Sequence, residues 1–403
     1  MLKPQSTLNR LFICANLRNL RMNLLNTLPL ALYIHLPWCV RKCPYCDFNS
    51  HEIKGGSFPE REYVAALVRD LEFSAGLFQG RELASVFLGG GTPSLISAEG
   101  IGAILDAVEA VSARSADTEI TLEANPGTVE SERFAGYRSL GVNRLSIGVQ
   151  SLDNAKLAAL GRIHDSDEAE AAFETAVGAG FTNINIDLMY GLPGQTVEDA
   201  LSDLAAAASL APAHISWYQL TIEPNTVFHA KPPTLPGDDL IWEMQTSGQD
   251  FLAGQHYRQY EVSAWSREGY ECRHNLNYWE FGDYIGIGAG AHGKISAGTV
   301  TREARLRVPA SYIRNAGTGS VIAEHKVLAQ EDLVLEFMLN ALRLKDGVPA
   351  GYFTGRTGLA PDAIREQVDA AGKEGLLEAG PGRIKATEKG ARYLNDLLQY
   401  FTP

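Results

Sequence analysis

Short apolar runs alternate with longer amphipathic segments through the first half of the chain. The runs predict six buried strands, near residues 31–36, 86–88, 120–123, 145–150, 184–188 and 214–218. Between the first two runs, Tyr63, Leu67, Leu71 and Phe78 recur at helical spacing. Strands and helices that alternate at intervals of a few tens of residues predict right-handed parallel β/α units. Six such units can form an open sheet or a partial barrel, so the pattern predicts an α/β fold.

The pattern changes after the sixth predicted strand. The segments expected next are an irregular, proline-rich connection at 225–236, a helix at 238–253, an extended segment at 257–265 and a turn of small residues at 283–293. Helices are then expected at 331–342, 361–371 and 388–399, with a hairpin between the last two, and this combination resembles a winged helix. The expected parts of the chain are an N-terminal extension at 1–30, the β/α part at 31–225, a connecting region at 226–324 and a mostly helical, winged-helix-like domain at 325–403.

The charge balance narrows the classes of partner. The chain has 403 residues and a formal net charge of −13, which argues against nucleic acid and against an electrostatic grip on anionic lipid. Residues 331–403 contain nine Lys or Arg and eleven Asp or Glu, whereas a DNA-binding winged helix is expected to be basic. No apolar run approaches the ~18 residues that a transmembrane helix needs. Sparse cysteines in a chain of this size indicate a reducing compartment, and we expect a cytoplasmic protein.

Residues 1–30 differ from the rest of the chain in charge. Four basic residues occur there, and no acidic residue appears before Asp47. The leucines and Phe12 could form an amphipathic stripe, which together with the basic charge is typical of a mitochondrial presequence. A disordered tail, or translation that begins at Met22, is the alternative interpretation.

Three of the five cysteines lie within eight residues, directly after the first predicted strand. Cys39, Cys43 and Cys46 therefore lie on a loop at the carboxyl end of a strand, where α/β folds place their active sites. Three converging thiolates need a cation to hold them. Structural zinc usually takes four protein ligands, and no second Cys-x-x-Cys pair is present. Three thiolates fit an iron–sulfur cluster with one iron left open, and three free thiols are the alternative.

The spacing Cys-x3-Cys-x2-Cys after a strand resembles the radical S-adenosylmethionine (SAM) superfamily. In that superfamily three cysteines hold a [4Fe–4S] cluster, and SAM binds the fourth iron. The flanking segments 33–37 and 47–48 are similar to the branch that contains oxygen-independent coproporphyrinogen III oxidases and HemW heme chaperones. The resemblance covers roughly residues 31–403. It implies a partial (β/α)6 TIM-like barrel, with Cys39, Cys43 and Cys46 as the cluster ligands.

Polar residues at the ends of later strands predict a ligand pocket near this loop. Glu123, Gln150 and Asp187 lie at or near strand ends, which suggests a polar ligand with hydroxyl groups, such as a ribose. The segment Gly90–Thr92 follows another strand, where backbone N–H groups can cradle a carboxylate. Arg162 could pair with a carboxylate. The resemblance implies that the SAM pocket is lined by Tyr33, Gly90, Gly91, Thr92, Glu123, Gln150, Arg162 and Asp187.

A second motif lies outside the predicted barrel, at 274–279. It offers one imidazole, two amides and two aromatic rings, in the order His-Asn-Leu-Asn-Tyr-Trp. Imidazole is a common ligand of heme iron, and aromatic rings pack against a macrocycle. The segment resembles the His-Asn-x-x-Tyr-Trp motif associated with heme binding in HemW. The resemblance implies heme contacts for His274, Asn275, Tyr278 and Trp279. Cys272, two residues before His274, is an alternative ligand that nothing in the motif supports.

One residue after the cysteines favours one branch over the other. The oxidase branch has a fourth cysteine, at the position of Phe48 here, and an extended N-terminal segment that helps enclose its tetrapyrrole. Phe48 together with the motif at 274–279 predicts a HemW-like heme chaperone that carries a [4Fe–4S] cluster and SAM. Its expected partners are heme and heme-acceptor proteins, with membrane-associated respiratory proteins as candidates, and not nucleic acid.

Two other functions stay open. One is SAM-dependent oxidative decarboxylation of coproporphyrinogen III propionates, in which the superfamily chemistry implies a 5′-deoxyadenosyl radical. The other is a winged-helix regulator that uses the cluster as a sensor, which the acidic C-terminal domain disfavours. The resemblance does not decide whether the HemW-like protein cleaves SAM, nor whether it is an enzyme.

Overall fold

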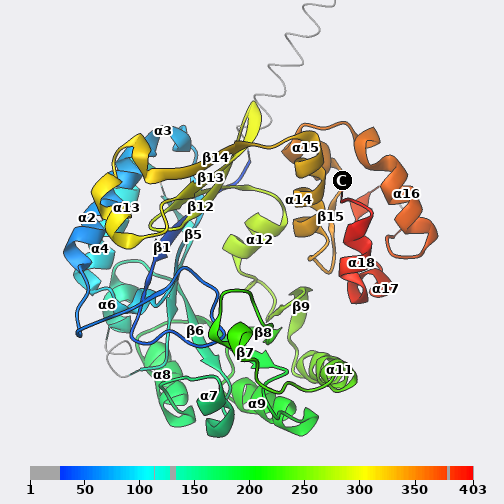
Figure 1. Ribbon diagram of the computed structural model, residues 1–403, viewed down its shortest axis with the longest axis horizontal. Coiled ribbons are helices and arrows are strands. Elements are labelled where there is room, and N and C mark those ends of the chain that lie inside the picture. The colour runs from blue at the N-terminus through cyan, green and yellow to red at the C-terminus, as the bar shows by residue number, and fades with distance from the viewer. Residues whose placement is uncertain (1–27, 113, 128–132, 379–381, 403) are drawn as a thin grey trace, which may run out of the picture.

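A twelve-stranded sheet forms the centre of the protein (Figure 1). The computed structural model describes residues 28–112, 114–127, 133–378 and 382–402. The middle of the sheet consists of the parallel strands β1 (Leu30–Leu36), β4 (Leu83–Gly90), β5 (Arg114–Ala124), β6 (Arg144–Gln150), β7 (Asn183–Tyr190) and β8 (His214–Gln219). These strands lie side by side in chain order, as successive β/α units require, and they confirm the six predicted strands.

Residues beyond the sixth parallel strand extend the sheet at both edges. The added strands are β9 (Arg258–Glu261), β10 (Ala264–Ser266), β11 (Asp283–Ile287), β12 (His292–Ala297), β13 (Thr299–Arg305) and β14 (Ile322–Val327). β11 pairs in parallel with β1, and β12 to β14 continue from it in antiparallel order. β10 and β9 continue from β8 at the other edge. The segment expected as a connecting region at 226–324 thus contributes strands to both edges of the sheet.

Helices cover the outer face of the sheet. The main ones are α2 (Glu60–Phe73), α4 (Ala98–Val111), α6 (Phe134–Ser139), α8 (Ser166–Gly178), α9 (Val197–Ser209) and α11 (Asp238–Gly254). Shorter ones are α3 (Ala75–Phe78), α7 (Asn154–Ala159), α10 (Val227–Ala230) and α13 (Pro309–Asn315). Figure 1 shows the main helices in an arc around the strands. The sheet ends at β14 and β9, which do not pair with each other, so the predicted partial barrel is confirmed as an open one.

The helix α4 shows how the sequence pattern sets this packing. Ile101, Ile104, Leu105 and Val108 recur at helical spacing, and all four are buried in the main core. Ser97 precedes the helix and caps it, because its hydroxyl accepts the Gly100 N–H at 3.0 Å. One apolar stripe therefore fixes α4 against the sheet.

A second core holds the C-terminal domain together. Its helices are α14 (Gln330–Ala341), α15 (Gly351–Thr357), α16 (Arg365–Lys373), α17 (Glu388–Arg392) and α18 (Leu394–Gln399). The predicted hairpin is present, because Leu377 and Ala386 form an antiparallel bridge. The structure adds a strand that the sequence did not predict: β15 (Val348–Pro349) pairs with β16 (Arg383–Ile384). Phe281 and Val300 also belong to this core, so the domain packs directly against the barrel part.

Two further expectations concern the N-terminal extension and membrane-spanning helices. Of the N-terminal extension expected at 1–30, residues 1–27 lie outside the described residues. Among the described residues, no helix is both long and apolar enough to cross a bilayer.

The contact between α11 and β8 depends on a glycine. A Cβ atom at Gly248 would lie 2.0 Å from Cη2 of Trp217. Trp217 is fully buried, and its ring packs against Trp265 and Tyr190 with centroids 5.9 and 4.3 Å away. The indole therefore cannot move aside without disturbing two further aromatic side chains.

We predict that Gly248→Ala destabilises the protein by about 1–3 kcal/mol through overpacking. Gly254→Ala, at the end of the same helix, is the matched control, because nothing lies within 4 Å of a Cβ atom there. Chemical denaturation of both variants measures the difference. Equal stability of the two variants would show that the helix–sheet contact is looser than described.

Candidate functional site

The three clustered cysteines lie on a compact loop between β1 and α2. The loop contains β2 (Trp38–Cys39) and β3 (His51–Glu52), which pair in parallel. The Ile53 N–H donates to the Cys39 carbonyl at 2.9 Å, and the Cys46 N–H donates to the Cys43 carbonyl at 3.1 Å. These bonds confirm that the cysteines follow a strand on a folded loop, as the sequence predicted.

The thiols differ in their surroundings. Cys39 is buried, and this burial raises the pKa of its thiol to about 11. Arg162 Nη1 lies 3.5 Å from the Cys43 sulfur, and Ser50 Oγ lies 3.6 Å from the Cys46 sulfur. In the described parts of the chain, no three Cys, His, Asp or Glu side chains converge on one metal position. A [4Fe–4S] cluster instead takes one thiolate on each of three irons, so three separate thiols on one loop fit a cluster better than a single ion.

The glycine-rich turn after β4 corrects one expectation. The Gly90 N–H donates to Glu123 Oε2 at 3.0 Å, and the Gly91 and Thr92 N–H groups donate to the Leu36 and Trp38 carbonyls. These N–H groups are used inside the chain, so the predicted N–H cradle for a carboxylate is wrong in this structure. The glycines are still required, because Gly90 has φ +121° and a Cβ atom there would lie 2.6 Å from the His35 ring.

Two half-buried carboxyl groups, Glu123 and Asp187, lie at the predicted strand ends. Burial raises the pKa of Glu123 to about 7, and the charge of Asp187 adds to the effect. Burial also raises the pKa of Asp187, although Ser146 Oγ and Asn185 Nδ2 donate to its carboxylate at 3.1 and 2.8 Å. The structure therefore brings together two of the residues predicted to bind SAM, and it surrounds one of them with hydrogen-bond donors.

Gln150 and Arg162 are held in place by their neighbours. Gln150 has φ 73°, a left-handed conformation that is unusual outside glycine, and its side-chain oxygen accepts the Tyr218 hydroxyl at 2.7 Å. Arg162 Nη2 donates to Asn125 Oδ1 at 2.8 Å and to the Gly148 carbonyl at 2.6 Å. Since Arg162 also reaches Cys43, it connects the strand ends to the cysteine loop.

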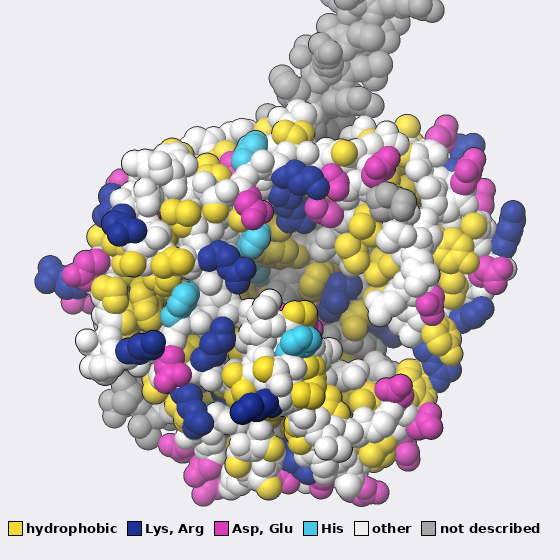
Figure 2. Space-filling view, viewed as in Figure 1, with side chains coloured by type: hydrophobic (Ala, Val, Ile, Leu, Met, Phe, Trp, Pro, Cys, Tyr) yellow, Lys and Arg dark blue, Asp and Glu magenta, His cyan; other side chains and the backbone are white. Residues whose placement is uncertain are grey.

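Two cavities are lined by some of the predicted site residues. A cavity of about 330 Å³ is lined by Tyr33, His35, Phe48, Asn49, Gly90, Glu123, Tyr278, Tyr284, Gly290, His292 and Arg307. A second one, of about 270 Å³, includes Cys43, Asn125 and Arg162 in its wall. Gly91, Thr92, Gln150 and Asp187 line neither. Figure 2 shows a hollow at the centre of one face, with histidines and basic side chains around it.

The segment 274–279, which resembles a heme-binding motif and is called the heme-like motif, lies on the short helix α12 (Arg273–Trp279). This helix packs against β4, β1 and β11 and against α14 of the C-terminal domain. His274 and Tyr278 are one turn apart on the same side, with ring centroids separated by 5.0 Å. Trp279 packs against the C-terminal core, and Asn275 is half-buried.

His274 points into the barrel rather than into a cavity. Its ring stacks on Phe87 with centroids 4.8 Å apart, and its Nδ1 atom is 2.9 Å from Ser85 Oγ. Burial lowers the pKa of His274 to about 3, so the imidazole is neutral, and its Nε2 atom is buried without a hydrogen-bond partner. A neutral imidazole with one unpartnered nitrogen fits a ligand of iron.

Sequence reasoning missed the residues that position this helix. The Glu119 carboxylate accepts the N–H groups of Arg273 and His274, each at 3.1 Å, and so caps α12. Ser85 fixes the His274 ring. Neither residue belongs to a motif, and a buried Glu in a strand gives no local signal of the helix that it caps.

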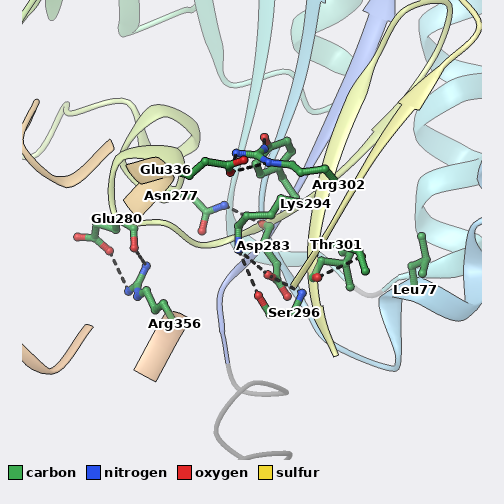
Figure 3. Close-up of polar contacts among 12 residues, drawn as sticks. Leu77, Asn277, Glu280, Asp283, Lys294, Ser296, Thr301, Arg302, Glu336 and Arg356 are labelled. Atoms are coloured by element: carbon green, nitrogen blue, oxygen red, sulfur yellow. Dashed lines mark hydrogen bonds and ion pairs between the residues drawn. The ribbon is translucent and has the colours of Figure 1, made fainter. Parts of the chain in front are cut away.

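A polar network connects α12 to the sheet and to the C-terminal domain (Figure 3). Asn277 Nδ2 donates to the Asp283 carbonyl at 2.8 Å, and Lys294 pairs with the Asp283 carboxylate at 3.1 Å. Arg356 on α15 pairs with Glu280 at 3.2 Å. The C-terminal domain therefore holds the end of α12 against the barrel part.

We predict that Glu123 makes the unliganded protein less stable as the pH rises from about 5 to 8. The raised pKa means that the folded state keeps a proton that the unfolded state loses, so stability falls through this range, by up to roughly 3 kcal/mol. Glu123→Gln removes this dependence, whereas Glu170→Gln, at an exposed position of α8, leaves it unchanged. Denaturation across the pH range measures it, and parallel curves for wild type and Glu123→Gln would contradict the burial of this carboxyl group.

Comparisons with known proteins agree with this geometry. The Radical SAM superfamily model matches residues 33–206, and the HemN C-terminal domain model matches residues 328–393. The solved coproporphyrinogen III oxidase HemN of Escherichia coli superposes with a TM-score of 0.80 over 96% of this chain and 93% of that chain, at 24% identity, which shows a shared fold.

Two relatives in sequence cover most of the chain. The protein named radical S-adenosyl methionine domain-containing protein 1, mitochondrial, of Mus musculus is 42% identical over 93% of this chain and 87% of its own length. The heme chaperone HemW of Escherichia coli strain K12 is 48% identical over 93% of this chain and 98% of its own length. At this identity and coverage, the chain belongs to the HemW family of radical SAM proteins.

Proposed function

We propose that this protein binds heme and delivers it to acceptor proteins, and that it carries a [4Fe–4S] cluster and SAM. The observation that carries the proposal is the composition of the 330 Å³ cavity. Its wall combines Tyr33 and Glu123 of the predicted SAM pocket, Phe48 of the cysteine loop and Tyr278 of the heme-like motif. A ligand in this cavity would touch all three parts at once.

Cys39, Cys43 and Cys46 would hold the cluster. Their loop is fixed by its own backbone hydrogen bonds, and Arg162 Nη1 lies 3.5 Å from the Cys43 sulfur. When bound, the cluster and SAM supply one-electron chemistry at the fourth iron. The HemW relatives support this assignment by family membership.

The SAM pocket would extend from the cysteine loop along the ends of β4 to β7. Glu123 and Asp187 can accept hydrogen bonds from ribose hydroxyls, and Gln150 and Arg162 are already oriented by neighbouring side chains. The N–H groups of Gly90, Gly91 and Thr92 are used internally, and Thr92 Oγ1 accepts Asn125 Nδ2, so this turn would contact SAM through its carbonyl oxygens.

Heme would approach α12 from the cavity. Tyr278 already lines the cavity, and His274 lies directly behind it against Tyr33 and Phe87. The rings of Tyr278 and Tyr33 lie 5.0 and 6.3 Å from the His274 ring, so heme iron that binds His274 Nε2 would displace one of these neighbours. Asn275 and Trp279 complete the proposed heme contacts on the neighbouring side of the helix.

Phe48 supports this function over coproporphyrinogen III oxidation. The side chain stands where the oxidase branch has a fourth cysteine, and it is 61% exposed and lines the cavity. An exposed phenyl ring suits an apolar macrocycle, whereas it cannot replace a thiol. The same proposal includes delivery of heme to acceptor proteins and a cytoplasmic location. The alternative location is the mitochondrion, with residues 1–30 as a presequence.

We predict that Cys43→Ala loses most of the cluster. After anaerobic reconstitution, bound iron and sulfide should fall at least about fivefold, because one of three thiolate ligands is missing. Cys272→Ser is the matched control, because Cys272 is buried beside Glu119 and away from the loop. Retention of full iron content by Cys43→Ala would remove this residue from the ligand set.

We also predict that His274→Phe weakens hemin binding by about tenfold. Phenylalanine keeps the stacking on Phe87 but lacks the nitrogen, so a loss of affinity reports on the ligand rather than on packing. His256→Ala, an exposed histidine next to α11, is the control. Optical titration measures the affinities, and unchanged binding by His274→Phe would rule out His274 as an iron ligand.

A further inference from the structure

The open side of the 330 Å³ cavity carries charged and imidazole groups that lie outside the heme-like motif. His292 and Arg307 line the cavity together with Tyr278, Tyr284 and Phe48. Both His292 and Arg307 are exposed. This edge of the cavity therefore combines aromatic rings, an imidazole and a guanidinium group within one wall.

The fold positions His292 rigidly. It is the first residue of β12, which pairs with β13 in the register His292–Ala304. The preceding turn lies against the end of β1, where a Cβ atom at Gly288 would be 2.4 Å from the His35 carbonyl oxygen. Because only glycine permits this approach, the turn brings β12 to the edge of the cavity.

His292 is the histidine of this wall that has free nitrogens. His35 also lines the cavity, but its Nδ1 is 2.9 Å from the Tyr33 hydroxyl and its Nε2 is 3.0 Å from the Asn49 carbonyl. Among the described residues, no hydrogen-bond partner occurs for either ring nitrogen of His292. An imidazole nitrogen that is not used inside the chain is available to bind a metal.

Arg307 offers a free positive charge at the same opening. Its carbonyl oxygen accepts Asn49 Nδ2 at 2.9 Å, which fixes the backbone, whereas its guanidinium has no carboxylate partner in the described part of the chain. A guanidinium group pairs with carboxylates in bidentate geometry. A ligand with a carboxylate at its rim would therefore find a partner here.

Aromatic rings complete the wall. Tyr278 and Tyr284 pack with centroids 4.1 Å apart, and Arg302 bonds to the Tyr284 hydroxyl. Arg302 also bonds to Glu336 of α14 (Figure 3). These contacts hold Tyr284 in place, while Phe48 is exposed and free to pack on a ligand. Flat aromatic surfaces suit a flat macrocycle.

We propose that heme binds at this opening with His292 as an axial ligand of the iron and with Arg307 paired to a propionate. The inference rests on the proposed heme-binding function and names the residues that receive the heme. Tyr278, Tyr284 and Phe48 pack against the porphyrin.

The test uses the full-length protein with its reconstituted cluster and hemin as the probe. We expect His292→Ala to weaken hemin binding by about tenfold. Its Soret band shifts to the position of a heme with one fewer strong axial ligand, and added free imidazole restores the wild-type spectrum. His325→Ala changes an exposed histidine on β14, which is separated from β12 by β13 and does not line the cavity, and this variant behaves as wild type. Unchanged affinity and spectrum in His292→Ala overturn the proposal.

A second comparison tests Arg307. Arg307→Ala weakens binding of hemin by roughly threefold to tenfold but leaves binding of hemin dimethyl ester unchanged, because the ester has no carboxylate to pair. Arg314→Ala, at an exposed position of α13, affects neither ligand. Equal losses for hemin and its ester refute the ion pair. If the wild-type protein does not bind hemin, the proposed function fails together with this inference. If the wild-type protein and His292→Ala bind hemin equally well, only this inference fails.

Discussion

A buried guanidinium group places positive charge near the carboxyl groups inside the barrel. Arg144 is 2% exposed, and its charge favours the ionised forms of Glu123 and Asp187. Although burial lowers the pKa of Arg144, the negative charges of neighbours that include Glu119 and Asp187 raise it. Carboxyl groups that are buried without a cation are costly, so this arginine permits a polar interior. Burial lowers the pKa of His274, and the charge of Arg144 adds to this effect, so the imidazole is neutral.

This arrangement links the two halves of the proposed function. Glu119 is part of the charge balance around Arg144, and its carboxylate also caps the helix that carries the heme-like motif. The C-terminal domain holds the other end of this helix, because Arg356 pairs with Glu280. A helix held at both ends, with the Tyr278 ring in the cavity, would provide a wall shared by the proposed cofactor pocket and the proposed heme site.

The sequence predicted the parts of the molecule that have a local signal. The six parallel strands were apparent because strands buried on both faces read as apolar runs, and the cysteine loop was apparent from its spacing. The edge strands β9 and β10 lie in the extended segment expected at 257–265, whereas the pairing of β15 with β16 had no such pattern. The N–H groups of the glycine-rich turn were expected to face a ligand, but they bond to the chain itself. Arg144, Glu119 and His292 matter through contacts between distant segments, which no single stretch of sequence displays.

The central claim is that one cavity serves heme binding rather than porphyrinogen oxidation. The most direct measurement combines a hemin titration with an anaerobic coproporphyrinogen III assay on the same reconstituted sample, supplied with SAM and reductant. The account predicts saturable binding of hemin and no formation of protoporphyrinogen. Formation of protoporphyrinogen by a sample that does not bind hemin would contradict it.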